Sequence, residues 1–169
     1  MSRKYKFYNK EFPYCVHLNR KEVISYTEAN TLEEALHKMS SVCKVSAITD
    51  GEKGLYYKVD DTTLHGLSKI DEVYSTIGSG DCLLAGIVAG HINQLENQEI
   101  VELGAACGAA NCIRPELGML HKKDVERLIK WSKINQFRSF SHLKKVKQLR
   151  NNTHVFYDDY HKMSSINLF

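Results

Sequence analysis

Apolar and polar residues follow one another along the chain in short strand-like runs and longer helical repeats. Three apolar runs have the length of buried strands, and five segments carry apolar residues at helical spacing. We expect strands at 14–18, 45–49 and 54–59, and helices at 20–26, 32–39, 80–93, 98–113 and 122–133. Strands flanked by helices predict a three-layer α/β unit in which a mostly parallel sheet lies between helices.

Composition agrees with an ordinary globular domain. The chain has 169 residues, 43% of them hydrophobic, which favours one domain with a real core. No apolar stretch is long enough to span a bilayer, and the basic N-terminus has no apolar segment behind it, so no signal peptide is expected. The five cysteines form no CxxC pair, which predicts reduced thiols, a cytoplasmic location and no zinc site.

The last part of the chain differs in character. We expect one domain over 1–133 and a basic extension over 134–169. Every charged residue from Arg127 to Arg150 is basic, and aromatic residues lie among them. Such a stretch could contact RNA or anionic lipid. Because the net charge is only +3, a solvated surface or extension is the favoured interpretation, and neither a nucleic acid nor a membrane is an expected partner.

A small-residue turn before an apolar helix is the most informative segment. Gly78, Ser79 and Gly80 allow backbone N–H groups to converge on an anion, and the following helix directs its positive dipole end to the same place. Asp81 stands at the junction, where a carboxylate can accept a proton from a hydroxyl. This arrangement suggests phosphoryl transfer to an alcohol. The alternative is an ordinary loop with an N-capping aspartate.

Two upstream segments suit the same chemistry. Asn19 and Glu22 follow the first strand and share one side of a helical turn, although taken alone the pair is the usual pattern of a helix cap. The strand at 45–49 leads into a glycine-containing turn from Thr49 to Gly54, which a plain hairpin also explains.

Taken in order, these segments resemble the ribokinase/PfkB family of carbohydrate kinases. His17–Glu22 is similar to the family's Lys-Pro-Asn-x-x-Glu, Thr49–Gly54 to its Thr-x-Gly-x-x-Gly, and Ser75–Asp81 to its Asp-Thr-x-Gly-Ala-Gly-Asp. The helix Gly104–Asn111 resembles the family's small-residue helix beside the nucleotide. Serine between the two glycines is most similar to the sugar-phosphate branch, which includes 1-phosphofructokinase and tagatose-6-phosphate kinase.

The resemblance implies a ribokinase-like fold, ATP and Mg²⁺ as cofactors, and roles for individual residues. Asp81 would be the catalytic base, and Gly78, Ser79 and Gly80 would form the anion hole. Asn19 and Glu22 would hold magnesium, mainly through water. The residues expected to line the nucleotide are Thr49, Gly51, Gly54 and Asn111.

The resemblance covers only the nucleotide-binding, C-terminal half of such a kinase, and the family's sugar-binding Gly-Gly motif has no counterpart. Two functions therefore stay open. The chain is either an ATP-dependent kinase of a sugar or sugar phosphate, completed by an N-terminal half or by a homodimer, or a non-catalytic nucleotide-binding remnant. An unpaired sheet edge is expected in either case.

Overall fold

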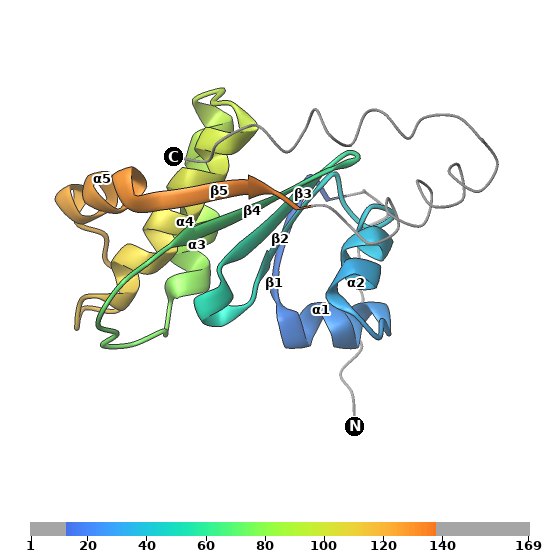
Figure 1. Ribbon diagram of the computed structural model, residues 1–169, viewed down its shortest axis with the longest axis horizontal. Helices are drawn as coiled ribbons and strands as arrows, with labels where there is room; N and C mark the ends of the chain where they lie inside the picture. Colours follow the sequence, from blue (N-terminus) through green and yellow to red (C-terminus); the bar gives the residue numbers. More distant parts are fainter. Residues whose placement is uncertain (1–12, 138–169) are drawn as a thin grey trace, which may run out of the picture. The chain divides into compact units, whose positions relative to one another are not determined.

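The structure is a computed structural model that describes residues 13–137, and Figure 1 shows the order of its elements. The strands are β1 (Cys15–Asn19), β2 (Val45–Thr49), β3 (Leu55–Val59), β4 (Thr62–Ser68) and β5 (Ser132–Gln136). The α-helices are α1 (Arg20–Thr27), α2 (Leu32–Met39), α3 (Ser79–Ile92), α4 (Asn97–Cys112) and α5 (Lys122–Trp131), and a 3₁₀ turn, η1, covers Gly51–Lys53.

The five strands form one sheet in the order β1-β2-β3-β4-β5. The α/β class is confirmed, but the sheet is mixed. Parallel pairing, expected for most strands, is limited to β1 and β2, and the other three pairings are antiparallel. Tight connections explain the difference, because strands joined by a few residues can only pair antiparallel. Residues 50–54 join β2 to β3, and residues 60–61 join β3 to β4.

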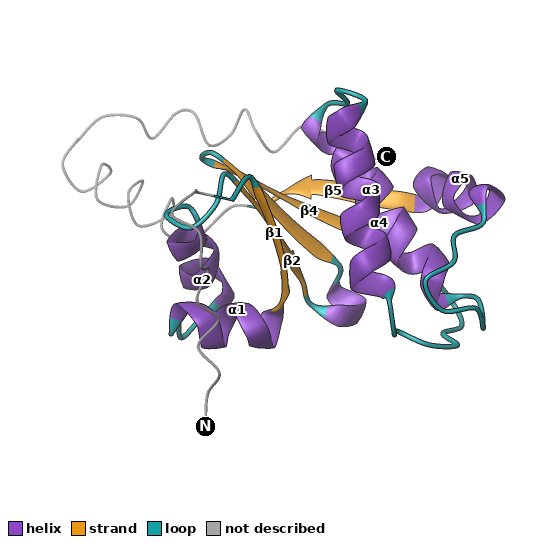
Figure 2. Cartoon of the chain, turned by 180° about the vertical axis from the view of Figure 1, so that it is seen from behind, coloured by secondary structure: helices purple, strands orange, loops and turns teal. Residues whose placement is uncertain are grey.

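Helices cover both faces of the sheet and give three layers. Helices α1 and α2 lie on one face, where Val23, Leu36 and Met39 pack against Val16 and Ile48. Helices α3 and α4 lie together on the other face, as Figure 2 shows from behind. Helix α5 packs on α4 through Leu128. The α1–α2 segment connects β1 to β2 and so makes their parallel pairing possible.

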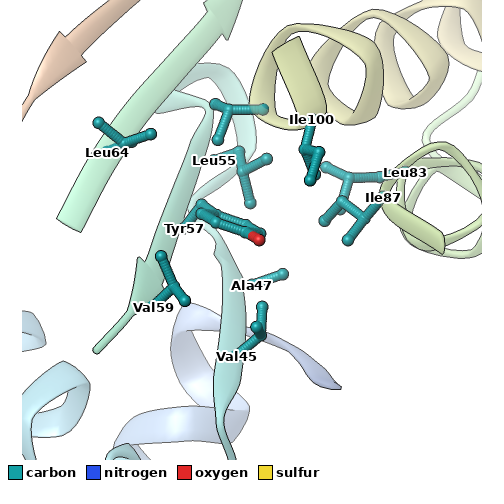
Figure 3. Packing of buried hydrophobic residues seen from close by; sticks show 10 residues of the cluster. Val45, Ala47, Leu55, Tyr57, Val59, Leu64, Leu83, Ile87 and Ile100 are labelled. Carbon is teal, nitrogen blue, oxygen red and sulfur yellow. The ribbon is translucent and has the colours of Figure 1, made fainter. Parts of the chain in front are cut away.

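The core nearest the α3 N-terminus lies between the sheet and the α3–α4 pair (Figure 3). Leu83 and Ile87 of α3 and Ile100 of α4 face Leu55 and Tyr57 of β3. Helices α3 and α4 meet through glycines, because a Cβ on Gly104 would lie 2.8 Å from Cγ1 of Ile87. This packing fixes α3 against the sheet, and therefore fixes the turn from which α3 starts.

Most expected elements are present within one or two residues of their expected bounds. Strands β4 and β5 were not expected. Strand β5 crosses the expected boundary between residues 133 and 134, and its Ile134 packs against the core. Most of the basic extension, from residue 138 onward, lies outside the described residues. Within residues 13–137, no helix is long and apolar enough to cross a membrane.

Candidate active site

The turn before α3 has the conformation that an anion-binding turn needs. Gly78 precedes the helix with φ 79°, in the left-handed region that glycine adopts without strain. No side chain caps the helix. The N–H of Ser79 donates to the carbonyl of Thr76, and the Ser79 hydroxyl donates to the same oxygen at 2.8 Å. Ser79 thus braces the turn, while the amides of Gly80 and Asp81 lie in the first turn, where no carbonyl of the helix can accept from them.

His17 joins this turn to the sheet. It lies on β1, on the face that carries α3, and its Nε2 is 3.3 Å from Oγ1 of Thr49 on β2. A Cβ built on Gly80 would be 2.6 Å from Cε1 of His17. The imidazole therefore fills the space between the strand ends and the first turn of α3. Glycine at position 80 is what allows this close approach.

Two carboxylates are close enough to His17 to influence its charge. Burial lowers the pKa of His17 from its usual value, and Glu22 and Asp81 oppose that change. His17 thus faces negative charge from α1 on one side and from α3 on the other. The structure brings together Glu22, His17, Thr49 and Asp81 from four separate segments of the sequence.

Asn19 and Glu22 form a complete capping box at the start of α1. Oδ1 of Asn19 accepts from the N–H of Glu22 at 3.0 Å, and Oε2 of Glu22 accepts from the N–H of Asn19 at 2.8 Å. This pair was expected to be either a helix cap or a magnesium site, and the cap is present. The capping bond uses one Glu22 oxygen. A carboxylate that keeps one oxygen for water fits Mg²⁺, which retains much of its hydration shell.

The turn after β2 contains two glycines with different environments. Both have positive φ, but a Cβ on Gly54 would collide with the backbone carbonyl of Gly66 on β4, while a Cβ on Gly51 would meet nothing within 4 Å. Gly54 therefore serves close packing within the sheet, and Gly51 faces open space. The nearby Asp50 carboxylate is neutralised by Arg20, whose Nη1 lies 2.7 Å from its Oδ2.

Asn111 is fully buried and its side chain connects two loops to α4. Its Nδ2 donates to the carbonyl of Ile77 at 2.8 Å, and its Oδ1 accepts from the N–H of Gly118 at 2.7 Å. Gly118 in turn lies beside Gly78, since a Cβ on Gly78 would be 3.3 Å from the Gly118 nitrogen. In this structure the Asn111 amide holds the Gly78–Gly80 turn and the Gly118 loop together.

Cys82 follows Asp81 but is buried, with its Sγ directed to Oδ1 of Asn111 at 3.6 Å. Burial, with the Asp81 carboxylate adding to it, raises the pKa of this thiol, so it stays protonated and packs as an apolar group. Among residues 13–137, no three His, Cys, Asp or Glu side chains gather in a metal-binding arrangement.

Two participants in this site were not among the predicted site residues. The family that the sequence resembles has lysine at the position of His17. The sequence feature that could have indicated a role for His17 was its place on β1, two residues before Asn19. Gly118 lies in the loop after α4, and only the fold brings it to Gly78.

The contact between His17 and Gly80 leads to a stability prediction. Gly80→Ala should force the imidazole to move and lower the free energy of unfolding by about 1–3 kcal/mol, as overpacking does. In a His17→Ala background the same change should be neutral or stabilising, because alanine is the better helix former. Urea unfolding of the four proteins in this double-mutant cycle measures the coupling. A Gly80→Ala protein that is stabilised in both backgrounds would contradict the contact.

Comparisons with known proteins identify a family for this chain. Residues 11–121 match the model of the pfkB family of carbohydrate kinases. A 1-phosphofructokinase of Vibrio cholerae is 26% identical over 81 residues, which make up 48% of this chain and 26% of that protein. A putative phosphofructokinase from Staphylococcus aureus has a similar fold, with a TM-score of 0.67 and 20% identity over 75% of this chain and 43% of that one.

A fructokinase double mutant from Vibrio cholerae, in a form with fructose, ADP and potassium ion bound, is similar with a TM-score of 0.60 and 17% identity, over 68% of this chain and 40% of that one. The chain thus spans less than half the length of these proteins. The family model, however, matches well over half of the chain and includes the β1 end, the β2 turn and the α3 turn described above. The chain belongs to the pfkB family of carbohydrate kinases.

Proposed function

We propose that this chain contributes the nucleotide-binding and catalytic part of an ATP-dependent kinase that phosphorylates a hydroxyl group of a sugar or sugar phosphate. The observation that carries the proposal is the α3 turn, where an exposed Asp81 follows two glycines and adjoins amides that no helix carbonyl can engage. A carboxylate beside an anion-binding turn is the arrangement that phosphoryl transfer to an alcohol requires.

In the proposed reaction, Asp81 accepts the proton of the attacking hydroxyl. The amides at the start of α3 and the helix dipole stabilise the negative charge on the transferred phosphoryl group. Glu22 and Asn19 would hold magnesium through water, and the ion would offset the charge of the phosphates. Arg20 helps by neutralising Asp50, which would otherwise repel phosphate near the β2 turn.

The loops that Asn111 joins are proposed to hold the nucleotide. Large apolar side chains are exposed on both of them, an arrangement suited to stacking against a planar base. They are Val73, Tyr74, Ile77, Leu117 and Met119. Asn111 then acts by positioning these loops rather than by touching the nucleotide, since its amide already binds both.

The second candidate is a nucleotide-binding chain without catalysis. The exposed apolar side chains on the loops that Asn111 joins support this candidate, because they suit nucleotide binding and take no part in the proposed proton transfer. Both candidates require nucleotide binding, and only the kinase requires turnover.

Nucleotide binding is the first measurement. ATP with Mg²⁺ at millimolar concentration should raise the melting temperature of the full chain, because a ligand that binds only the folded state stabilises it. Glu22→Gln should reduce the magnesium-dependent part of this shift, while the shift with ATP and EDTA stays as in the unmodified protein. Glutamine preserves the capping box, so the fold should be unaffected.

A matched control is Glu126→Gln, an exposed carboxylate on α5. It should leave both shifts unchanged. The absence of any shift with ATP and Mg²⁺ would refute both candidate functions. A shift without turnover of any sugar or sugar phosphate would leave the non-catalytic candidate.

A further inference from the structure

A cavity of about 260 Å³ opens at the end of the sheet where β2 begins and β3 ends. The described residues that line it are Ser40, Cys43, Lys44, Ser46, Lys58 and Asp60. The candidate active site instead uses Thr49, which lies at the other end of β2. Pockets for drug-sized ligands span about 300–1,000 Å³, so this cavity suits a small ion or chemical group. It is separate from the residues proposed for catalysis.

Strand geometry places three of these side chains on one face of the sheet. Val45 and Ala47 pack in the core between the sheet and the α3–α4 pair (Figure 3). Because side chains alternate along a strand, Ser46 points to the opposite face, which carries α1 and α2. Lys58 is directly opposite Ser46 in the β2–β3 register, and Lys44 lies two residues before Ser46. The fold therefore brings two lysines beside one serine.

Ser46 is a buried hydroxyl that has no protein partner. Its exposed fraction is 3%, and within residues 13–137 its side chain forms no hydrogen bond. Every fully enclosed side-chain nitrogen or oxygen in that part of the chain does have a partner. The Ser46 oxygen is therefore open to the cavity that the residue lines. Buried polar groups are nearly always hydrogen-bonded, so this hydroxyl requires a bound water or a ligand.

The two lysines are available to bind an anion. Within residues 13–137 neither Lys44 nor Lys58 forms an ion pair with a carboxylate. Lys58 uses one N–H to donate to the carbonyl of Asp60 at 2.6 Å and keeps two more. Nζ of Lys44 lies 5.8 Å from the centroid of the Tyr14 ring, a contact that uses none of its N–H donors. An ammonium group only donates, so an oxyanion is the partner that these donors suit.

The remaining charge in the cavity limits the attraction without cancelling it. Asp60 is exposed in the β3–β4 turn and contributes one negative charge against the two lysines. Burial raises the pKa of the Cys43 thiol to about 11, so this side chain stays neutral. The described lining therefore has a net positive charge, with Asp60 as the group that opposes an anion.

We propose that this cavity binds the phosphoryl group of a small compound, either inorganic phosphate or a phosphate monoester. The ammonium groups of Lys44 and Lys58 neutralise its oxygens, and the hydroxyl of Ser46 donates to one of them. The donors come from the end of α2, from β2 and from β3, and such separate directions suit a tetrahedral group better than a planar carboxylate. The site does not rest on the proposed kinase function, because the two share no residue.

The test is an NMR titration of the full, ¹⁵N-labelled chain with inorganic phosphate, methyl phosphate and acetate at constant ionic strength. The amide signals of residues 43–46 and 58–60 should shift and reach saturation with phosphate. Acetate should bind about tenfold more weakly, the difference expected for one lost hydrogen bond to a charged group. Signals of residues 78–81 report separately on any anion at the α3 turn.

Four variants test the assignment of the site. Lys58→Gln and Ser46→Ala should each weaken binding by about three- to tenfold, as loss of one donor does. Ser46→Ala removes no hydrogen bond within the described residues, so its melting temperature should not fall. Asp60→Asn should tighten binding because it removes the opposing charge, and asparagine tolerates the φ of 48° at this position. Lys130→Gln, an exposed lysine on α5 outside the cavity, should change nothing.

The two phosphate compounds distinguish the sources of the ligand. Saturation with inorganic phosphate alone assigns the site to the free ion, and saturation with methyl phosphate as well assigns it to phosphate monoesters. Either result supports the proposal. It is overturned if the signals of 43–46 and 58–60 do not move, if only residues 78–81 respond, or if acetate binds as tightly as phosphate. Normal binding by both Lys58→Gln and Ser46→Ala would also overturn it.

Discussion

Asp81→Asn is expected to lower kcat for sugar or sugar-phosphate phosphorylation by about 10²–10⁴-fold, which is the usual contribution of a general base. Asparagine has the size of aspartate but cannot accept the hydroxyl proton as a carboxylate does. The side chain is exposed, so the loss should not come from unfolding. Only the favourable interaction of the carboxylate with the α3 dipole is lost, at a cost of about 0.3–1 kcal/mol in stability.

The measurement is ADP release coupled to a spectrophotometric assay, with the chain alone and with a completing polypeptide. ATP affinity should stay nearly unchanged. Asp61→Asn, an exposed carboxylate in the β3–β4 turn, is the matched control and should keep full turnover. An Asp81→Asn enzyme with normal kcat would remove Asp81 from the mechanism.

Asn111→Asp is expected to destabilise the fold by about 3 kcal/mol and to weaken nucleotide binding. In the unmodified protein Nδ2 of Asn111 donates to the carbonyl of Ile77 at 2.8 Å. The substitution replaces this donor by an oxygen, so two oxygens face each other at that distance. It also buries a carboxyl group at a position with no exposure. A buried polar group that loses its partner costs about 1–3 kcal/mol, and a charged one costs more.

Asn93→Asp provides the same change on the surface. Nδ2 of Asn93 donates to the carbonyl of Ala89 at 2.7 Å, but the residue is exposed, so water can replace the bond. We expect a loss below about 1 kcal/mol there. Urea unfolding of both variants, with ATP titrations at a temperature where each is folded, separates the stability effect from the effect on the loops. If the two variants lose the same free energy of unfolding, the buried Asn111 side chain does not stabilise the loops as described.

The hydrophobic pattern was sufficient to predict the helices and strands that are specified by their own residues. Helix α2 and strand β2 have the expected bounds, and the α3 turn lies where the glycines place it. Strand β4 was missed because glycine and polar residues interrupt its apolar positions. Strand β5 was missed because it is mostly polar, with Ile134 as its one apolar residue, and it forms by pairing with β4. Such pairing depends on residues far away in the sequence.

The candidate site, too, combines features that the local sequence predicts with features that depend on distant contacts. Glu22, Thr49 and Asp81 lie near His17, while the roles given to them in the site stay predictions. Gly54 and Asn111 were expected beside the nucleotide. Their environments show close packing against Gly66 for the first and a buried link between loops for the second. Neither environment can be read from neighbouring residues, since the contacts come from β4 and from the loop after α4.

The pairing of β5 with β4 also has a consequence for how the chain assembles. Ser68 and Ser132 are bonded across 64 positions of sequence, and all of α3, α4 and α5 lies between them. The β2–β3–β4 meander needs only short connections, whereas this contact closes a long loop and carries the corresponding entropic cost. During synthesis the sheet can therefore be completed only after residue 136 has left the ribosome. Until β5 pairs with it, β4 is an edge strand of the sheet.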